Sequence, residues 1–515
     1  MTALSLAMVL AESARRHPDT VAVVDGDIRV TYAELWLEAR CHAAGLRAAG
    51  VAPGDRVALL APNVVDFPRV YYATLALGAV VVPVHLLLTA EEAARLLRDS
   101  GAKLLVCHTS QLEMGARAAA LAGVTLVTVG PAPTPPDVVR LEDAGTALAP
   151  LPTYETRQAE DTAVILYTSG TTGAPKGAQL THLNLVLNAT VNVFDANDAR
   201  SDDVVLGCLP LFHSFGQTVA MNGTFRVGAT LVLLGRFTGP AAIDLMLREQ
   251  VTVFHGVPTM YVALLDAARG RQPLPRLRMC ISGGASLPVA VLERFSDSFD
   301  TTVYEGYGLS ETSPTATKNQ PAFGTRAGTV GHPVWGVEVE IARADLDDRI
   351  ELLPAGEIGE IVIRGHNVFA GYLGRPEATA EVLVDGWFRS GDLGRRDADG
   401  FVTIADRKKD LVIRGGFNVH PREVEEVLAR HPAVDQVAVI GIPDPLHGEE
   451  ICAVVVPNPT VPRPAEQDLV DWSRERLGRH KYPRRIRYVD ALPLGPSHKV
   501  LKRELRRTMA EPSRE

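Results

Sequence analysis

The segment Tyr167-Thr-Ser-Gly-Thr-Thr-Gly-Ala-Pro-Lys-Gly177 is the most informative stretch of the chain. It follows an apolar, strand-like run at 162–166, the place where a parallel sheet presents a loop at its carboxyl edge. Small residues let backbone N–H groups surround phosphate oxygens, and the order Gly-Lys-Ser/Thr of a Walker A loop is missing. Composition alone fits a solvated turn equally well, but the residue order favours a phosphate-binding loop. Its side-chain donors are Thr168, Ser169, Thr171, Thr172 and Lys176.

Strand-like and helical patterns alternate on the N-terminal side of this loop. Thr31-Tyr-Ala-Glu34 and Thr89-Ala-Glu-Glu92 are capping boxes, and strand-like runs at 56–61 and 103–107 separate the helical patterns. Repeated strand–helix–strand units predict a mainly parallel sheet with helices on both faces. The Pro-rich stretch 131–152 is expected to be an irregular connection.

The bulk properties predict a soluble protein of several domains. A chain of 515 residues exceeds one ordinary core, and a net charge of −9 argues against a nucleic-acid binder. The five cysteines are far apart and odd in number, which favours reduced thiols in the cytoplasm. The apolar run Val70–Leu88 is interrupted by Gly78, Pro83 and His85, so it predicts a buried helix (70–77) and a strand (79–84) rather than a membrane span. No signal peptide is expected at the N-terminus, and the sequence leaves a homodimer open.

Five further segments carry chemistry-bearing residues in a fixed order. They are Leu209-Pro-Leu-Phe-His-Ser-Phe-Gly216, Ile281-Ser-Gly-Gly-Ala-Ser286, Glu305-Gly-Tyr-Gly-Leu-Ser-Glu311-Thr, Trp387-Phe-Arg-Ser-Gly-Asp392 and Asp406-Arg-Lys-Lys-Asp410. Together with the phosphate loop they resemble the adenylate-forming superfamily, which includes acyl-CoA synthetases, adenylation domains and beetle luciferases. The run from Asp385 to Asp410 is similar to the longer signature of fatty acyl-CoA synthetases. The resemblance extends from the Tyr32 region to Arg503.

The resemblance implies an α/β fold of two domains. Residues 1–406 would form a large N-terminal domain of layered sheets with helices and a small β subdomain. Residues 407–409 would form a hinge, with Lys409 as the pivot, and residues 410–515 a small, mobile α+β lid. A surface lysine is the plain alternative for Lys409.

The function implied is an ATP-dependent ligation of a carboxylic acid to coenzyme A, through an acyl-AMP intermediate and with Mg²⁺. A medium- to long-chain fatty acid is the first choice of substrate, and an aryl acid or malonate remains open. The alternatives are an enzyme that loads a carrier protein, a light-producing oxygenase, and a nucleotide-binding regulatory protein without catalysis.

The resemblance also assigns site residues. Glu311 would hold Mg²⁺, a hard ion that prefers carboxylate and phosphate oxygens, and Lys499 would contact the carboxylate and the α-phosphate. Many relatives have Thr at the position of Ser310 and Gly at the position of His498. The catalytic set is Lys499, Lys176, Glu311 and His213. The ATP- and AMP-binding set is Thr168, Ser169, Gly170, Thr171, Thr172, Gly173, Lys176, Gly283, Gly284, Ala285, Glu305, Gly306, Tyr307, Gly308, Ser310, Asp392, Arg407 and Lys499.

The coenzyme A and acyl sites are the least specific assignments. Gly415, Gly416 and Phe417 would line the pantetheine tunnel, and the basic run 474–487 would either meet the coenzyme A phosphates or form a solvated face. Arg226 and Arg236 remain candidates for binding a second carboxylate. The acyl pocket is assigned to His213, Phe215, His255 and Gly256, in segments that also hold Phe212 and Met260.

Overall fold

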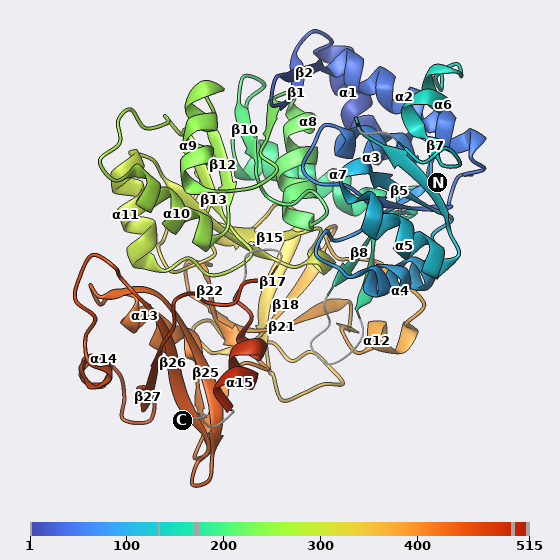
Figure 1. Ribbon diagram of the computed structural model, residues 1–515. Helices are drawn as coiled ribbons and strands as arrows, with labels where there is room; N and C mark the ends of the chain where they lie inside the picture. The colour runs from blue at the N-terminus through green and yellow to red at the C-terminus, as the bar shows by residue number, and fades with distance from the viewer. Residues whose placement is uncertain (1–2, 132–133, 169–174, 496–499, 511–515) are drawn as a thin grey trace.

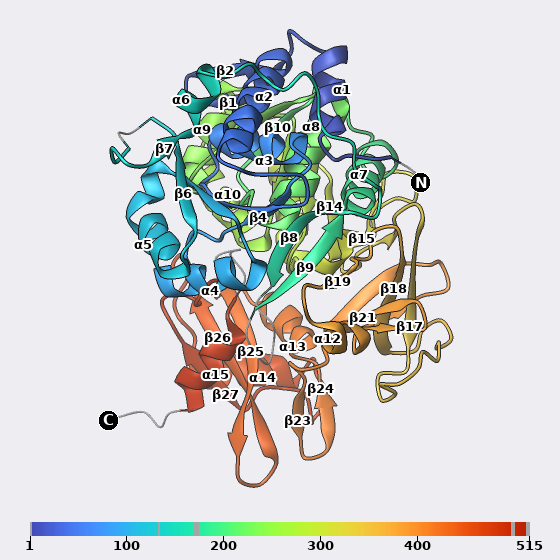
Figure 2. The same cartoon turned by 90° about the vertical axis from the view of Figure 1, so that its right-hand side faces the viewer.

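Two large sheets form the body of the molecule (Figures 1 and 2). The computed structural model describes residues 3–131, 134–168, 175–495 and 500–510. Within these residues one sheet has the strand order β19-β9-β8-β4-β3-β5-β6-β7, and its central strands are parallel. Its strands are β3 (Arg56–Leu60), β4 (Val80–Pro83), β5 (Leu104–His108), β6 (Thr125–Val129), β7 (Val139–Arg140), β8 (Thr162–Thr168), β9 (Lys176–Thr181) and β19 (Gly371–Tyr372).

The second large sheet has the order β16-β15-β14-β13-β12-β10-β11-β1-β2 among the described residues. Strands β10 to β14 and β1 run parallel to their neighbours in the middle of the sheet. The strands are β1 (Val21–Asp25), β2 (Ile28–Thr31), β10 (Val204–Gly207), β11 (Thr230–Leu233), β12 (Val253–Gly256), β13 (Met279–Ser282), β14 (Val303–Gly308), β15 (Thr315–Lys318) and β16 (His332–Pro333). The predicted parallel, helix-covered sheet is therefore confirmed, and there are two of them.

Helices cover the faces of both sheets in Figure 1. The capping boxes begin α2 and α4 as predicted: Thr31 and Thr89 each accept a hydrogen bond from the backbone N–H of the glutamate three residues on. The helices of this part are α1 (Met8–Arg16), α2 (Tyr32–Ala48), α3 (Asp66–Ala76), α4 (Ala90–Ser100), α5 (Leu112–Ala122), α6 (Leu141–Thr146), α7 (His182–Val191), α8 (Gly223–Val227), α9 (Gly239–Arg248), α10 (Pro258–Ala268), α11 (Val289–Phe299) and α12 (Pro376–Ala380). Two π-helical segments, η2 (Asn192–Ala196) and η3 (Phe215–Asn222), and two 3₁₀ turns, η1 (Thr109–Gln111) and η4 (Ser310–Thr312), complete it.

Two sequence predictions can be compared with this body. The apolar run at 70–88 contains the end of α3 and β4, both buried, as predicted. No helix in the described part of the chain is long and apolar enough to cross a membrane. The Pro-rich stretch was wrongly predicted to be irregular throughout, because it contains β7 and α6. The side chain of Leu141 in α6 is buried and packs closely against Gly45 of α2. This tertiary contact stabilises a short helix that the Pro-rich composition did not predict.

A small β unit and a C-terminal unit follow. The small unit has the order β17-β18-β21-β20, with β22 paired to β21: β17 (Val337–Ala342), β18 (Gly359–Gly365), β20 (Leu383–Val384), β21 (Trp387–Arg396) and β22 (Val402–Arg407). The C-terminal unit contains β23 (Val412–Arg414), β24 (Phe417–Val419), β25 (Val434–Asp444), β26 (Gly448–Pro457) and β27 (Arg485–Tyr488) with α13 (Pro421–Leu428), α14 (Glu466–Arg474) and α15 (Lys502–Ala510). It lies at one end of the molecule in Figure 2.

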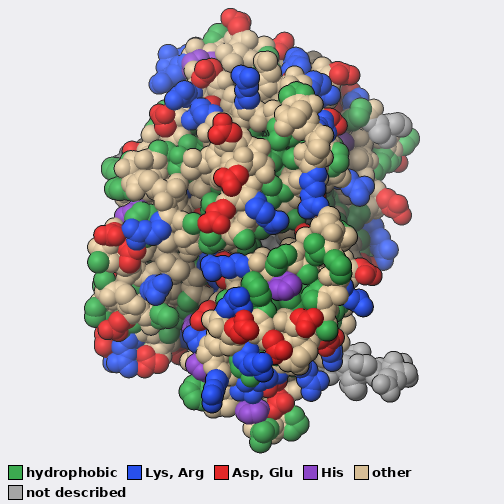
Figure 3. All heavy atoms as spheres, turned by 90° about the vertical axis from the view of Figure 1, so that its left-hand side faces the viewer, with side chains coloured by type: hydrophobic (Ala, Val, Ile, Leu, Met, Phe, Trp, Pro, Cys, Tyr) green, Lys and Arg blue, Asp and Glu red, His purple; other side chains and the backbone are tan. Residues whose placement is uncertain are grey.

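Acidic and basic side chains are interspersed on the face drawn in Figure 3. The fold class is the predicted one.

Candidate active site

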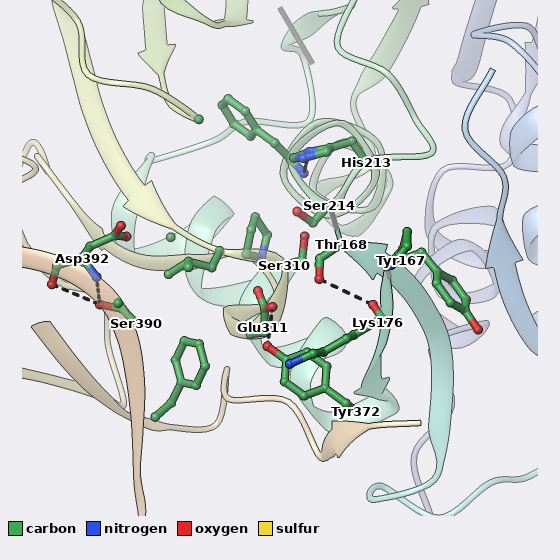
Figure 4. Close-up of a pocket in the computed structure, with 18 of the residues that line it drawn as sticks. Tyr167, Thr168, Lys176, His213, Ser214, Ser310, Glu311, Tyr372, Ser390 and Asp392 are labelled. Carbon is green, nitrogen blue, oxygen red and sulfur yellow. Dashed lines mark hydrogen bonds between the residues drawn. The ribbon is translucent and has the colours of Figure 1, made fainter. Parts of the chain in front are cut away.

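A cavity of about 1390 Å³ lies at the carboxyl ends of β8 and β14, where the two large sheets and the small β unit meet. This is the edge at which parallel sheets of α/β proteins bind ligands. Its described lining includes residues from all six predicted segments, with Arg407, Lys408 and Lys409 from the last of them. Figure 4 shows ten of these side chains by name around the same space.

A tyrosine, an aspartate and an arginine meet at one side of the cavity. The Tyr307 hydroxyl donates to Asp392 Oδ2 at 2.7 Å, and Arg407 Nε lies 3.4 Å from Asp392 Oδ1. Asp392 on β21 is paired in register with Arg407 on β22, which fixes the two side chains together. Tyr307 comes from β14, 85 residues earlier in the chain. This group presents a carboxylate, a guanidinium and an aromatic face, the chemistry that a ribose and a base require.

Glycines bring backbone close to this side of the cavity. Gly283, Gly284, Gly306 and Gly308 all line it, whereas Ala285 does not. A Cβ on Gly308 would lie 1.7 Å from the carbonyl oxygen of Pro314, so no other residue fits there without a shift of backbone. Glu305 does not line the cavity: it is a fully buried residue of β14, it accepts a hydrogen bond from the Leu287 N–H at 3.0 Å, and burial raises its pKa to about 7.

A second group lies where β8 and β9 meet η4. Lys176 Nζ is 5.0 Å from the centre of the Tyr372 ring, and the Tyr372 hydroxyl donates to Glu311 Oε1 at 2.9 Å. Glu311 is buried, and the loss of solvent raises the pKa of its carboxyl. Figure 4 shows Lys176, Glu311 and Tyr372 side by side, with Ser310 just above them. A cation, a hydroxyl and a carboxylate here can bind phosphate groups together with a divalent ion.

The donor set fits Mg²⁺. Glu311 brings a carboxylate to this part of the cavity, and Mg²⁺ is typically held by one or two carboxylates, substrate phosphates and water. Thr168 pairs with Lys176 across β8 and β9.

The predicted phosphate-loop residues Ser169, Gly170, Thr171, Thr172 and Gly173 lie outside the described residues, as does Lys499.

The predicted acyl residues separate into two groups. His213, Phe212 and Phe215 line the cavity beside Ser214 and Val219, at the start of the π-helical segment η3. His255 does not line it: this residue borders a second, smaller cavity that shares Val219 with the first. Gly256 lines neither cavity, and its carbonyl accepts a hydrogen bond from the Gly283 N–H at 3.2 Å. Met260 is buried in the core behind β12.

Neither arginine proposed for a second carboxylate reaches the cavity. Arg226 stacks on Phe194, with 4.9 Å from the guanidinium carbon to the ring centre, and Arg236 is exposed. The structure instead places Lys318, from the last position of β15, in the wall. No sequence motif singled out this residue or Tyr372.

The predicted coenzyme A residues are not at the cavity. Gly415, Gly416 and Phe417 form the tip of the β23–β24 hairpin, which Figure 2 shows far from β8 and β9. Phe417 is 59% exposed, and its ring lies 5.0 Å from that of His480. Lys409 lines the margin of the cavity between the small β unit and the C-terminal unit. In the basic run, Lys481 is paired with Glu423 at 2.8 Å.

The chain matches two family models. The AMP-binding enzyme model covers residues 10–373, and the model of the AMP-binding enzyme C-terminal domain covers residues 423–499. This chain belongs to the AMP-binding enzyme family.

Relatives of this AMP-binding enzyme cover nearly all of it. Feruloyl-CoA synthases of Amycolatopsis sp. and Streptomyces sp. are 41% identical over 96% of this chain and 97% of their own length. A long-chain-fatty-acid–CoA ligase of Bacillus subtilis is 32% identical over 97% of this chain and 94% of its own. The ATP-bound crystal structure of MatB from Rhodopseudomonas palustris superposes with a TM-score of 0.88, at 35% identity over 98% of this chain and 99% of that one. The predicted superfamily is confirmed, and the protein is an AMP-forming acid–thiol ligase.

Replacing Asp392 with asparagine in this enzyme is expected to raise the KM for ATP roughly tenfold to a hundredfold. The change removes the charge that faces Arg407, and loss of a hydrogen bond to a charged group costs about 1.5–3 kcal/mol. Initial rates at varied ATP, with melting curves to check folding, measure the effect. Asp399→Asn is the matched control, because Asp399 is exposed and paired with Arg326 away from the cavity. An unchanged KM in Asp392→Asn would count against a ribose-binding role.

Proposed function

We propose that this enzyme joins an aromatic carboxylic acid of the hydroxycinnamate type to coenzyme A. The observation that carries the proposal is that one cavity is lined by three sets of residues. Tyr307, Asp392 and Arg407 are suited to a nucleoside, and Lys176 and Glu311 are suited to phosphates and a metal. Aromatic side chains around His213 form the third set. The 41% identity to feruloyl-CoA synthases supports the choice of acid. A fatty acid, the first choice from the sequence, is the second candidate, supported by the 32% identity to a long-chain-fatty-acid–CoA ligase.

The first half-reaction forms acyl-AMP. A carboxylate oxygen attacks the α-phosphorus of ATP, the bond to the β-phosphate breaks, and pyrophosphate leaves. Two anions approach each other, so positive groups and fixed donors must offset the charge. We assign Lys176, Ser310 and Lys499 to the phosphates and the attacking carboxylate, and Tyr307, Asp392 and Arg407 to the nucleoside. Glu311 would hold Mg²⁺, which supplies charge neutralisation at the phosphates.

The second half-reaction forms the thioester. The sulfur of coenzyme A attacks the carbonyl carbon of acyl-AMP, the thiol proton passes to solvent, and AMP leaves with the oxygen that came from the acid. No side chain of the protein forms a covalent bond in either step. The five cysteines support this assignment. None forms a disulfide, and burial raises the thiol pKa of Cys107, Cys208, Cys280 and Cys452 above the usual range, which makes these thiols poor nucleophiles.

We propose that residues 410–515 act as a lid that turns about residues 407–409 between the two steps. The support is the position of Gly415–Phe417, which lies away from the cavity although the second step requires a path for the thiol arm. Exchangeable polar contacts join the described lid to the body: the backbone N–H of Arg422 donates to Asp406, its guanidinium donates to the Ile404 carbonyl at 2.7 Å, and Glu426 accepts a hydrogen bond from the backbone of Val289. Polar contacts between domains can be broken and replaced by contacts with water at a small cost in free energy, so the two parts can move relative to each other. We also propose a cytoplasmic location, which the free cysteines support.

The test is a substrate panel with product analysis. Purified protein, ATP and Mg²⁺ are incubated with cinnamic, hydroxycinnamic, benzoic, malonic and C4–C16 fatty acids, each with and without coenzyme A. Hydroxycinnamoyl-CoA and AMP as the fastest products would support the proposal, and palmitoyl-CoA as the fastest product would replace the acid with a fatty acid. Acyl-AMP that persists when coenzyme A is added would favour a carrier-loading enzyme instead.

A further inference from the structure

Lys318 is a buried lysine in the wall of the active-site cavity. Only 1% of its surface is exposed, and its Nζ has no hydrogen-bond partner among the described residues. The nearest aromatic group is the ring of Tyr304, whose centre lies 5.9 Å from Nζ. Burial lowers the pKa of this lysine well below its usual value. A buried, unpaired amino group is costly, so it is retained where something binds to it.

Lys318 faces the acyl region and not the phosphates. It ends β15 and is paired in register with Gly306 on β14, whereas Gly308, next to the η4 turn of Ser310 and Glu311, lies two strand residues further along, about 7 Å away. The lysine therefore reaches the cavity at a distance from the metal and phosphate group. Phe215, Val219 and Ile281 supply the apolar lining of this region.

A histidine on the same face of the sheet shares this environment. His255 aligns with Ile281 on β13, and Ile281 aligns with Tyr304 on β14, so these side chains and Lys318 lie on one face. Both ring nitrogens of His255 lack a partner in the described part of the chain. Burial, followed by the charge of Lys318, lowers the pKa of His255 to about 3. His255 lines the smaller neighbouring cavity, so among these groups it is Lys318 that brings an unpaired nitrogen to the wall of the acyl region. An alkyl chain bound there would leave the Lys318 amino group unpaired.

We propose that Lys318 determines substrate specificity by binding an oxygen atom, a phenolic hydroxyl or a second carboxylate, at the end of the acid remote from the reacting carboxylate. The proposal rests on the function proposed above and makes it more specific. It selects acids with a polar end over acids of the same shape that end in hydrogen.

The experiment compares matched acids. The pairs are cinnamate with 4-hydroxycinnamate, and hexanoate with adipate, which separate a phenol from a carboxylate as the bound group. For wild type, kcat/KM should be at least about tenfold higher for the oxygen-bearing member of one pair. Lys318→Met should reduce that preference by roughly 10–100-fold, chiefly through loss of activity on the oxygen-bearing acid. Lys318→Gln, which keeps a donor, should fall between, and Lys103→Met, a surface lysine paired with Asp55, should leave the ratio unchanged.

Thermal unfolding separates this role from a structural one. Without ligands, Lys318→Met should melt roughly 2–4 °C higher than wild type, because an unpaired buried amino group is replaced by an apolar side chain. A lower melting temperature in both Lys318 variants, together with equal losses for both members of each pair, would overturn the proposal. If no acid is adenylated, the function proposed above fails, but the lysine is still tested. The oxygen-bearing acid, 4-hydroxycinnamate or adipate, should raise the melting temperature of wild type more than its partner acid does. This difference should be absent in Lys318→Met. Equal shifts from both acids in wild type would overturn the proposal.

Discussion

Replacing Glu311 with glutamine is expected to slow acyl-AMP formation by roughly a hundredfold or more. Glu311 lies with Tyr372 and Lys176 in the group that we assign to the phosphates and the metal, and one fixed group aimed at developing charge is typically worth about 3 kcal/mol. Glutamine has nearly the same shape and still accepts a hydrogen bond from Tyr372, so the loss reports the missing charge rather than a cavity. The rate of pyrophosphate release at saturating acid, measured over a range of Mg²⁺ concentrations, gives the effect, and the variant should need more Mg²⁺.

Tyr372→Phe is the matched variant for this prediction. It removes the hydroxyl that donates to Glu311 but keeps the carboxylate and the ring that lies against Lys176. Loss of one hydrogen bond to a charged group, about 1.5–3 kcal/mol at most, should slow the same step by roughly tenfold to a hundredfold and leave the requirement for Mg²⁺ less affected. A glutamine variant with wild-type rate and wild-type Mg²⁺ dependence would contradict the assignment of Glu311 to the metal.

Replacing Lys499 with alanine is expected to separate the two half-reactions. Acyl-AMP formation should fall by roughly a hundredfold or more, because our proposal assigns the Lys499 ammonium to the attacking carboxylate and the α-phosphate. Thioester formation from supplied acyl-AMP and coenzyme A should stay within about threefold of wild type, since in our proposal the lid has turned by then. The assays are pyrophosphate release for the first step and thioester formation from synthetic acyl-AMP for the second.

A basic residue elsewhere on the lid provides the control for this prediction. Arg463 lies over the Tyr488 ring, outside the basic run 474–487, and does not line the cavity, so Arg463→Met removes a lid charge without changing either step. Equal loss in both half-reactions of Lys499→Ala would show that the residue supports the lid as a whole. Full activity in the first step would remove it from the reaction.

The order of local patterns predicted most of the fold and several of the residues that line the cavity. Capping boxes and apolar runs are short-range signals, and α2, α4, β3 and β5 begin or end within one residue of the expected positions. The group of Tyr307, Asp392 and Arg407 was predicted as three separate residues by resemblance, and the strand register brings them within hydrogen-bond or ion-pair distance.

Residues whose role depends on pairing between distant strands escaped the sequence. Tyr372 reaches Glu311 because β19 pairs with β9, about 190 residues earlier, and Lys318 enters the cavity because β15 turns back along β14. Neither has a local signature. For His255 the prediction was wrong in the opposite direction: the residue was assigned to the acyl pocket, but it lines the smaller cavity, which shares only Val219 of its described lining with the cavity that His213 lines. The orientation of the lid likewise depends on contacts that no single segment contains.

Transfer of a carboxyl oxygen to AMP tests the central claim most directly. The enzyme is incubated with ATP, Mg²⁺, coenzyme A and an acid labelled with ¹⁸O in both carboxyl oxygens, and the AMP is analysed by mass spectrometry. Attack of the carboxylate on the α-phosphorus predicts AMP that carries one ¹⁸O atom, unlabelled pyrophosphate, and acyl-CoA that keeps the second ¹⁸O atom in its thioester carbonyl. Acyl-CoA formed with unlabelled AMP, or with ADP and labelled phosphate, would contradict an acyl-AMP intermediate.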